Sequence, residues 1–341
     1  MEATKKIGSI FNQKGKESIV KKRSIALLED SYISPLLINT LIREQVPAHA
    51  QSNRLKEELG RYYPDLILLD EDETANILAE SGSLVCANSD LALSTMREIL
   101  KGPFEVNVID SLKDKSVSGI YLSKALTDSD KRGDEKASIQ DKDFACDAYF
   151  NVDGEPVVLG IYEHPVLEKD DSRDIVYFTS SEVMKKMLPR MKDALRKMSS
   201  SQLDLRNLPL HAKFRLQKNH LLIIEVKLRR FGSFSLSDLL FFAFGMNPYK
   251  QYFRGQKPDW DSALSLAGDD IFFRVLSRLT AVVPAGRIPD HIEYANTFQN
   301  LVGYCKLDPD RYPAFSIAFA RTENLEDVRK YLSMNFGDFL T

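Results

Sequence analysis

The first third of the chain alternates short apolar runs with segments of helical spacing. The pattern predicts strands at 25–28, 46–50, 66–69 and 84–87 and helices at 35–42, 74–79 and 91–100. Each apolar run is short enough for a strand and has no polar alternation, as in strands that are buried on both faces. Strands that alternate with helices at this spacing predict a parallel sheet covered by helices.

After residue 143 the pattern is typical of antiparallel strands. Every second residue from Phe144 to Phe150 is apolar, as expected for the buried face of a strand, and Asp153-Gly154 then supplies a turn. A second strand and an extended arm are expected to follow, up to residue 180. Further along, the pattern predicts an amphipathic helix at 182–197, strands at 272–283 and 315–321, and a closing helix at 325–334.

The most specific pattern in the chain is a hairpin followed by a helix. Strand-forming runs at 212–216 and 221–226 flank a short polar segment at 218–220, which predicts a tight antiparallel hairpin. A helix with apolar spacing is expected at 236–244, and Gly245 is placed to end it.

The hairpin brings one acid and two lysines together. If its loop has three residues, Lys213 lies opposite Glu225. Side chains alternate between the faces of a strand, so Glu225 and Lys227 point the same way. The sequence therefore predicts a charged cluster in the middle of a largely apolar sheet.

Composition describes an ordinary folded chain with little net charge. The 341 residues are 43% apolar and 28% charged, enough for two or three packed subdomains. The formal net charge of −3 argues against a nucleic-acid partner. No apolar run is long enough to cross a bilayer and no signal-peptide core follows Met1, so we expect a cytoplasmic protein without a membrane partner. The three cysteines lack metal-type spacing, and buried thiols are expected at Cys86, Cys146 and Cys305.

The hairpin resembles the last core segment of the ATP-grasp superfamily, whose members include ATP-dependent carboxylate-amine ligases. In that family the segment typically reads H-A-E-F-R-L and then I-E-V-N-P-R-F-G-G. The direct matches are His211, Ala212, Phe214, Arg215, Leu216, Ile224, Glu225 and Val226, and with one extra residue after Lys227 also Arg230, Phe231 and Gly232. Further similarity lies in residues 144–180 and in the run A-x-G-x-N-P-Y at 243–249.

The resemblance implies an α/β chain, α+β in its C-terminal part, with the ATP-grasp fold. The lysines and arginine among small and polar residues at 1–23 predict a basic flexible leader. The resemblance divides the rest into a Rossmann-like pre-ATP-grasp domain at 24–102, an N-terminal lid subdomain at 103–180 and a C-terminal subdomain at 181–341. No G-x-G-x-x-G follows the first predicted strand, so the sequence has no dinucleotide fingerprint.

The resemblance also implies ATP and Mg²⁺ as cofactors. Three acid or amide positions of the family hold Mg²⁺ against the ATP phosphates, and here they are Lys213, Glu225 and Lys227. Glu225 is therefore the one metal ligand that remains, and the two lysines belong to the cofactor-binding site. A charged lysine has donors and no acceptor, so weakened cofactor binding is expected.

A second set of cofactor contacts is implied in the lid subdomain. The family has an ATP-contacting lysine before a proline there, followed by a loop of glycine or serine over the phosphates. The lysine position is Asn107 in this chain, and the loop residues match at Ser116, Ser118 and Gly119. The hinge acid of the family would fall on Lys136. Both charged groups of the family pattern are thus replaced.

Three arginines are the candidate catalytic groups, Arg173, Arg229 and Arg230. In the family reaction ATP phosphorylates a carboxylate and an amine then attacks the acyl phosphate. Guanidinium groups could stabilise the phosphate charge in such a reaction. Arg173 could equally form a structural ion pair with Asp170 or Asp174, and the sequence leaves both alternatives open.

Two functions fit these observations. The first is a degenerate homologue, or pseudoenzyme, that kept the fold, lost Mg-ATP catalysis and acts as a regulatory or assembly partner of another protein. In this case Lys213 and Lys227 form an ion cluster with Glu225, and removing the acid would leave two partly buried charges unpaired, at a cost of about 3–5 kcal/mol as for a buried pair. The second is an active ligase that joins a carboxylate and an amine, with Lys213 and Lys227 replacing the charge of the metal. The replacements at three separate places favour the first.

Overall fold

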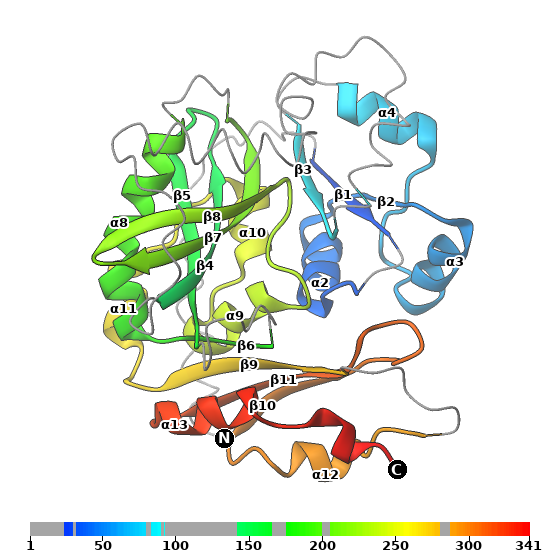
Figure 1. Cartoon of the computed structure of the whole chain (residues 1–341). Helices are drawn as coiled ribbons and strands as arrows, with labels where there is room; N and C mark the ends of the chain where they lie inside the picture. The colour runs from blue at the N-terminus through cyan, green and yellow to red at the C-terminus, as the bar shows by residue number, and fades with distance from the viewer. Residues whose placement is uncertain are drawn as a thin grey trace.

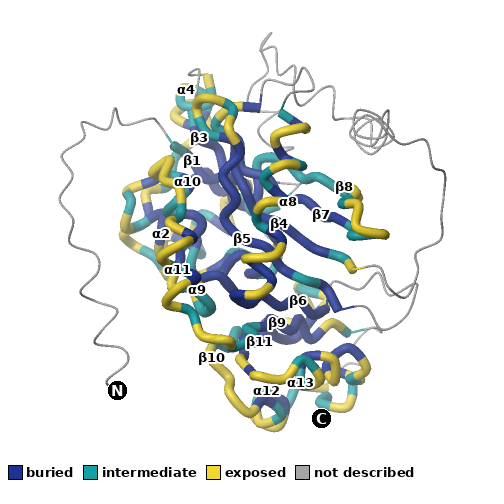
Figure 2. The backbone as a smooth tube through the Cα atoms, turned by 90° about the vertical axis from the view of Figure 1, so that its left-hand side faces the viewer, coloured by how far each residue is buried: buried dark blue, intermediate teal, exposed yellow. Residues whose placement is uncertain are grey.

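The computed structural model describes residues 24–29, 32–79, 83–89, 92, 142–165, 175–199, 205–279 and 287–341. Figure 1 shows a small sheet, formed by residues 24–87, beside a much larger sheet formed by later residues. Apart from the two edge strands of the large sheet, the strands of both sheets are mostly buried, and many exposed residues lie on the outward sides of the helices (Figure 2). The α/β class with an antiparallel C-terminal part is confirmed.

The small sheet has three parallel strands in the order β2-β1-β3. Its elements are β1 (Ser24–Leu28), α2 (Pro35–Glu44), β2 (Ala48–Ala50), α3 (Asn53–Tyr62), α4 (Glu71–Ala79) and β3 (Leu84–Ala87). The predicted parallel pairing is therefore confirmed. Its Rossmann-like character stays a prediction, because only these three strands lie among the described residues, and the helix expected at 91–100 lies outside them except for Ala92.

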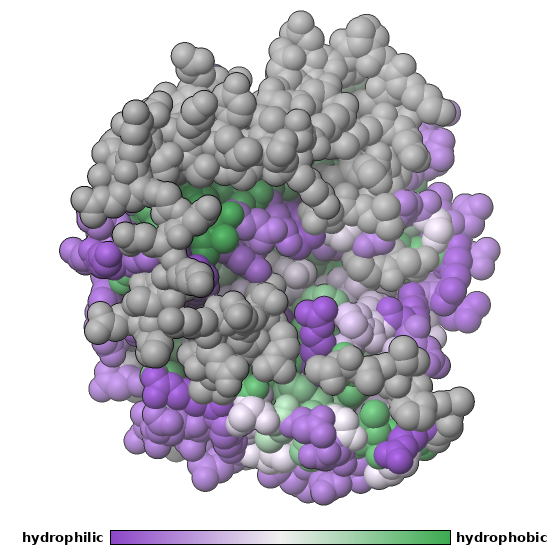
Figure 3. Space-filling model, in the orientation of Figure 1, coloured by the Kyte–Doolittle hydropathy of each residue, from purple (hydrophilic) through white to green (hydrophobic). Residues whose placement is uncertain are grey.

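Two of these helices begin where serine supplies a cap. The hydroxyls of Ser34 and Ser52 accept the N–H groups of Leu37 and Leu55, as expected at the first residue of a helix. The pattern did not predict α3, because only Leu55 and Leu59 mark its buried side. The outward surface over α3 is correspondingly hydrophilic (Figure 3).

The prediction of a strand at 66–69 is wrong. Only Leu68 forms a bridge, to Ala48 at the outer edge of β2, and the side chain of Ile67 is 46% exposed. The backbone bonds that surround this bridge are Ala48 N to Ile67 O and Leu69 N to Ala48 O, at 2.8 and 2.9 Å. An apolar run of this length does not distinguish a buried strand from an irregular segment along a sheet edge.

The large sheet has eight strands in the order β10-β11-β9-β6-β5-β4-β7-β8. Their bounds are β4 (Lys142–Phe150), β5 (Pro156–His164), β6 (Val176–Thr179), β7 (Leu208–Gln217), β8 (His220–Leu228), β9 (Ile271–Arg278), β10 (Leu301–Lys306) and β11 (Ala314–Thr322). All neighbouring strands pair antiparallel. The β7–β8 hairpin forms an edge of this sheet, so its predicted central position is wrong. The sequence pattern also missed β10.

The helices of the large unit pack on the sheet and at its ends. They are α8 (Ser181–Ser199), η2 (Leu236–Asp238), α9 (Leu239–Phe244), α10 (Pro248–Arg254), α11 (Trp260–Leu266), α12 (His291–Ala295), α13 (Leu325–Arg329), η3 (Lys330–Leu332) and η4 (Phe336–Phe339). α8 and the η2–α9 pair confirm the helices predicted at 182–197 and 236–244, and the latter ends at Gly245 as expected. None of the helices that the structure describes has the length and apolar character needed to span a bilayer.

The turn between β7 and β8 has two residues rather than three. Lys218 and Asn219 have φ angles of 46° and 70°, the conformation that tight two-residue hairpins favour. The register shifts further along the hairpin, where Lys213 pairs with Glu225 and Ile224 is the extra residue of a bulge. The pairing of Lys213 with Glu225 is therefore confirmed, although the bulge and not a longer loop produces it.

A buried carboxylate joins the small sheet's first helix to the large unit. Asp238 is 6% exposed, and the Ser34 hydroxyl donates to its two oxygens at 2.8 and 2.7 Å. Ser235 donates to the same carboxylate at 2.8 Å and Tyr249 at 3.5 Å. Because Ser34 also caps α2, one hydroxyl starts the helix and attaches it to η2.

Gly160 on β5 lies directly against α9. A Cβ added there would lie 2.4 Å from Cδ1 of Leu240. We expect Gly160→Ala to lower the free energy of unfolding by about 1–3 kcal/mol in denaturant titrations, because the site is already filled. The matched control is Gly60→Ala in α3, where an added Cβ meets nothing within 4 Å. It should instead raise stability by about 0.5–1 kcal/mol, and equal effects of the two substitutions would contradict this packing.

Asp238 should make stability depend on pH. Burial raises its pKa to about 7, although the hydroxyls of Ser34 and Ser235 oppose this shift. A carboxyl whose pKa is higher in the folded state stabilises the fold fully below its unfolded pKa, and this contribution is lost as pH rises through about 7. The unfolding free energy of the wild type, measured relative to that of Asp238→Asn, should therefore decrease by on the order of 2 kcal/mol between pH 5 and pH 8. Parallel pH profiles of the two proteins would exclude this role.

Candidate functional site

Three rows of mostly polar side chains lie on one face at the β8 edge of the large sheet. The paired residues are Asp147, His211 and Lys227 in the first row, Ala145, Lys213 and Glu225 in the second, and Asp143 and Arg215 in the third. They share a face because partners across a ladder point the same way. The third row is a bidentate ion pair, with Arg215 Nε and Nη2 at 2.7 and 2.8 Å from the carboxylate of Asp143.

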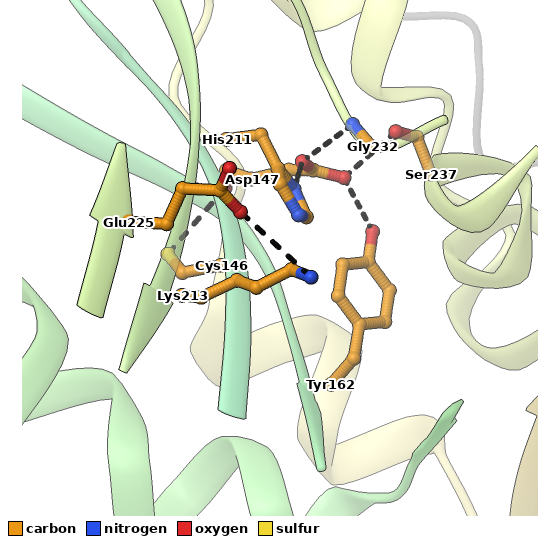
Figure 4. Close-up of polar contacts among 8 residues, drawn as sticks. All are labelled: Cys146, Asp147, Tyr162, His211, Lys213, Glu225, Gly232 and Ser237. Carbon is orange, nitrogen blue, oxygen red and sulfur yellow. Dashed lines mark hydrogen bonds and ion pairs between the residues drawn. The ribbon is translucent and has the colours of Figure 1, made fainter. Parts of the chain in front are cut away.

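Asp147 is the fully buried member of this face (Figure 4). Its oxygen Oδ1 lies 2.8 Å from His211 Nδ1 and accepts the Gly232 N–H at 2.9 Å. Its oxygen Oδ2 accepts the hydroxyls of Tyr162 at 2.9 Å and Ser237 at 2.7 Å. Its exposed fraction is 0%, so the carboxylate has exchanged water for four protein partners. Charged hydrogen bonds of this kind fix the side chains that make them.

The predicted cluster of one acid and two lysines is present beside this network. Lys213 Nζ lies 3.8 Å from Oε2 of Glu225, and Lys227 Nζ lies 3.4 Å from Oε1 (Figure 4 shows the first pair). The side chains are 24%, 28% and 40% exposed for Lys213, Lys227 and Glu225, so the cluster is partly buried, as expected. An edge strand leaves these groups in contact with water. The cost of removing Glu225 therefore falls from the buried value to about 0–1 kcal/mol for each pair.

Arg229 and Arg230 follow β8 where the chain turns towards the small sheet. Arg229 has a φ of 61°, donates its N–H to Pro209 at 2.6 Å and accepts the Ala87 N–H at 2.8 Å. Burial lowers the pKa of its guanidinium. Arg230 is 5% exposed and forms a parallel bridge with Ala87 at the end of β3. Both arginines thus lie at the junction of the two sheets, and their catalytic roles stay predictions.

The remaining predicted site residues lie outside the described part of the chain. They are Asn107, Ser116, Ser118 and Gly119 of the expected nucleotide loop, Lys136 of the expected hinge, and Arg173. The structure therefore brings together the hairpin half of the predicted site, namely Lys213, Glu225 and Lys227. The domain boundaries expected at residues 102 and 180 also stay predictions.

The described residues do not fit a magnesium site. Mg²⁺ requires hard oxygen ligands in an octahedral arrangement, and Glu225 alone supplies oxygens on its row. Both of its oxygens face ammonium groups, which cannot coordinate a cation. In the part of the chain that is described, no three His, Cys, Asp or Glu side chains lie together in a way that could hold a metal.

The Asp147 network was not predicted from the sequence. Asp147 stands between Cys146 and Ala148 in a strand whose other residues are mostly apolar and buried. An acid at an interior strand position must find donors, which is the signal that could have identified it. Tyr162 and Ser237 gave no such signal, because their shared partner is defined by the fold and not by spacing along the chain.

Comparison with known proteins agrees with the motif of the hairpin. A family model described as an ATP-grasp domain matches residues 135–238, which include β4, β5, β7 and β8. None of the curated proteins matches the sequence.

Solved structures share the fold over nearly the whole chain. An L-amino acid ligase from Bacillus licheniformis superposes with a TM-score of 0.57 at 11% identity, covering 94% of this chain and 98% of the ligase. Phosphoribosylglycinamide synthetase from Anaerococcus prevotii gives 0.58 at 11% identity, covering 94% and 99%. The biotin carboxylase domain of Hydrogenobacter thermophilus 2-oxoglutarate carboxylase, solved with MgADP, ADP and bicarbonate, gives 0.55 at 10% identity, covering 92% and 90%.

The domain match and the shared fold lead to one assignment. The matched segment contains the Asp147 network and the cluster of Lys213, Glu225 and Lys227. The shared fold extends the likeness to both sheets. Residues 135–238 thus match an ATP-grasp domain, and nearly the whole chain shares its fold with an L-amino acid ligase and a phosphoribosylglycinamide synthetase.

Proposed function

We propose that this chain is a degenerate ATP-grasp protein that acts as a regulatory or assembly partner of another protein without Mg-dependent ligation. The observation that carries the proposal is the position of Glu225 between two ammonium groups, 3.8 Å from Lys213 and 3.4 Å from Lys227. The lysines neutralise the acid that would otherwise attract a divalent cation. The ion pairs therefore occupy the place of the metal.

Electrostatics support this interpretation. A cation that approached Glu225 would have to displace both ammonium groups and would then remain beside two positive charges. Unit charges about 4 Å apart near a protein surface repel each other by about 4 kcal/mol. A single carboxylate cannot supply enough ligands to offset such repulsion, because most of the coordination shell would remain open. The replacements at Asn107 and Lys136 weaken the phosphate and adenine contacts in the same direction.

An active ligase is the second candidate. It is favoured by the exposure of the two ammonium groups, 24% and 28%, which leaves them accessible to a phosphate. In this reaction ATP transfers its terminal phosphoryl group to a carboxylate, giving ADP and an acyl phosphate, and an amine then displaces phosphate to form an amide. Lys213 and Lys227 would neutralise phosphate charge, but ammonium groups cannot bridge two phosphates as Mg²⁺ does.

Nucleotide titration distinguishes the two candidates. We expect isothermal titration with ATP, with and without Mg²⁺, to give no binding that requires the metal, because Glu225 is already paired. Incubation with ATP and mixtures of amino acids should release no ADP above the rate without protein. Tight binding that depends on Mg²⁺ would contradict the degenerate function, whereas metal-independent binding coupled to ADP release would support the lysine-based ligase.

Restoring the family residues tests the site directly. We expect Lys213→Glu combined with Lys227→Asn to fold normally, because both side chains are partly exposed, and to gain Mg-dependent ATP binding of at least about tenfold, equivalent to about 1.4 kcal/mol. The control is Lys142→Glu, which changes a charge on the opposite face of β4 and removes the ion pair between the half-exposed Lys142 and Glu163. In an active lysine-based ligase the double variant would lose ADP release instead.

A further inference from the structure

The outward side of α8 concentrates positive charge in a chain that is otherwise acidic. The 19 residues of this helix contain six lysines or arginines and two acids, whereas the whole chain has 46 basic and 49 acidic residues. A buried stripe rich in methionine packs α8 against the large sheet, on the side away from the small sheet (Figure 1). The cations therefore face water.

The six cations form two lines along the helix. By the helical period, the lines are Lys185, Lys192 and Arg196 on one flank and Lys186, Arg190 and Lys197 on the other. The acids Glu182 and Asp193 lie on the ridge between them. Lys186 and Arg190 are four residues apart, and like charges at this spacing destabilise a helix. The stability of α8 therefore does not explain the arrangement.

Nearby acids neutralise only part of this charge. Lys197 pairs with Asp193 at 3.0 Å, and Arg196 lies 3.8 Å from Glu155. All four of these side chains are more than half exposed, so water weakens both pairs. Lys186 forms no ion pair with any acid that the structure describes. The second line therefore retains positive charge for a ligand.

Arg190 is held in place without being neutralised. Its Nη2 donates to Oδ1 of Asn219 at 2.6 Å, and its Nη1 donates to the carbonyl oxygen of the same residue at 3.4 Å. Asn219 belongs to the β7–β8 turn, so its exposed neighbour Lys218 adds a third cation beside the second line. A guanidinium group has five N–H donors, and three remain after these two bonds. A side chain that is already ordered loses less entropy when it binds a ligand.

We propose that Lys186, Arg190 and Lys218 bind an acidic, extended segment of a partner protein. Carboxylates only accept hydrogen bonds, and they pair bidentately with guanidinium groups. Every second side chain of an extended segment is about 6.6 Å apart. The rise along the helix from Lys186 to Arg190 is about 6 Å, so a segment with an acid at every second residue fits. The proposal deepens the function proposed above and rests on it, because it gives the protein partner a chemical character.

A broad anionic surface fits this side of α8 less well. A nucleic-acid duplex or a lipid surface that covered both lines would also meet Glu182 and Asp193, which repel phosphate. A narrow segment can follow one line and avoid this ridge. The helix has no aromatic residue for stacking on bases, and its methionines pack inward and not towards a membrane. Carboxylates of a protein segment are therefore the favoured ligand.

The test is the binding of a fluorescently labelled peptide of four Glu-Ser repeats to the full chain, measured by anisotropy. The same peptide with Gln in place of Glu is the neutral probe. We expect saturable binding of the acidic peptide that weakens between about 50 and 200 mM salt, because exposed charges are screened. The neutral peptide should not bind. Equally tight binding of duplex DNA, or of vesicles of phosphatidylserine and phosphatidylcholine in equal parts, would overturn the proposal.

Charge removal locates the binding surface. Lys186→Gln combined with Arg190→Gln should weaken peptide binding by about tenfold, as expected for the loss of two exposed ion pairs. The matched control is Arg54→Gln combined with Lys306→Gln, which removes two exposed cations from α3 and β10 and should bind like wild type. Thermal unfolding should verify that both double variants are folded. Equal weakening by the two pairs would show attraction by net charge alone and refute the surface.

Asn219→Gly tests whether the position of Arg190 matters. The substitution removes the side-chain acceptor but no charge, and glycine adopts the φ angle of 70° without strain. We expect peptide binding to weaken by about threefold, because Arg190 must then be ordered by the ligand. Unchanged binding would refute the role of the positioned guanidinium group.

Peptide binding and nucleotide binding can fail separately. Ala212 and Phe214 of β7 pack in the same core as the methionines of α8, and Lys213 points to the other face of the sheet. Lys213→Glu combined with Lys227→Asn should therefore leave peptide binding intact. A chain that binds neither Mg-ATP nor the peptide would keep the degenerate site and lose only the proposed surface. Mg-dependent ATP binding would contradict the proposed function whatever the peptide does.

Discussion

The buried carboxylate of Asp147 is the interaction on which the rest of the site depends. A charge without exposure is tolerated only when hydrogen bonds replace its water, and four donors do so here. They come from β5, β7, η2 and the loop after β8, which are far apart in the sequence. One side chain of β4 therefore fixes the position of the whole segment that follows the hairpin.

The segment after the hairpin is held by two acids. Ser237 donates to Asp147, and Ser235 donates to Asp238, so neighbouring serines bind carboxylates on different elements. This arrangement holds the loop that contains Phe234 and Ser235, whose φ angles are 50° and 54°, and joins the two sheets at the same place. The charged residues Lys213, Glu225 and Lys227 lie outside this junction, at a more solvent-exposed edge of the sheet. Substitutions at these positions can therefore occur without disturbing the junction.

Local patterns in the sequence predicted the elements but not the long-range contacts. Alternation located β4, β7 and β8, and the glycine at position 245 marked the end of α9. The prediction of a strand at 66–69 was wrong because the burial of this run depends on where the sheet ends, and a local pattern does not contain that information. The exposure of Glu225 could not be predicted either, since it follows from the position of β8 at the sheet edge. The hydrogen bond between Asp238 and Ser34 could not be predicted, because the two residues are 204 positions apart in the sequence.

The extra residue at Ile224 gives β8 two halves of opposite phase. Before it, the strand presents one set of side chains to the core; after it, the alternation is reset and turns Glu225 and Lys227 towards His211 and Lys213. The tip of the hairpin can therefore change in length or composition while a compensating shift at the bulge preserves the charged row. Sequence comparison that counts residues from the turn would misplace this row by one position, whereas counting back from the buried loop would not.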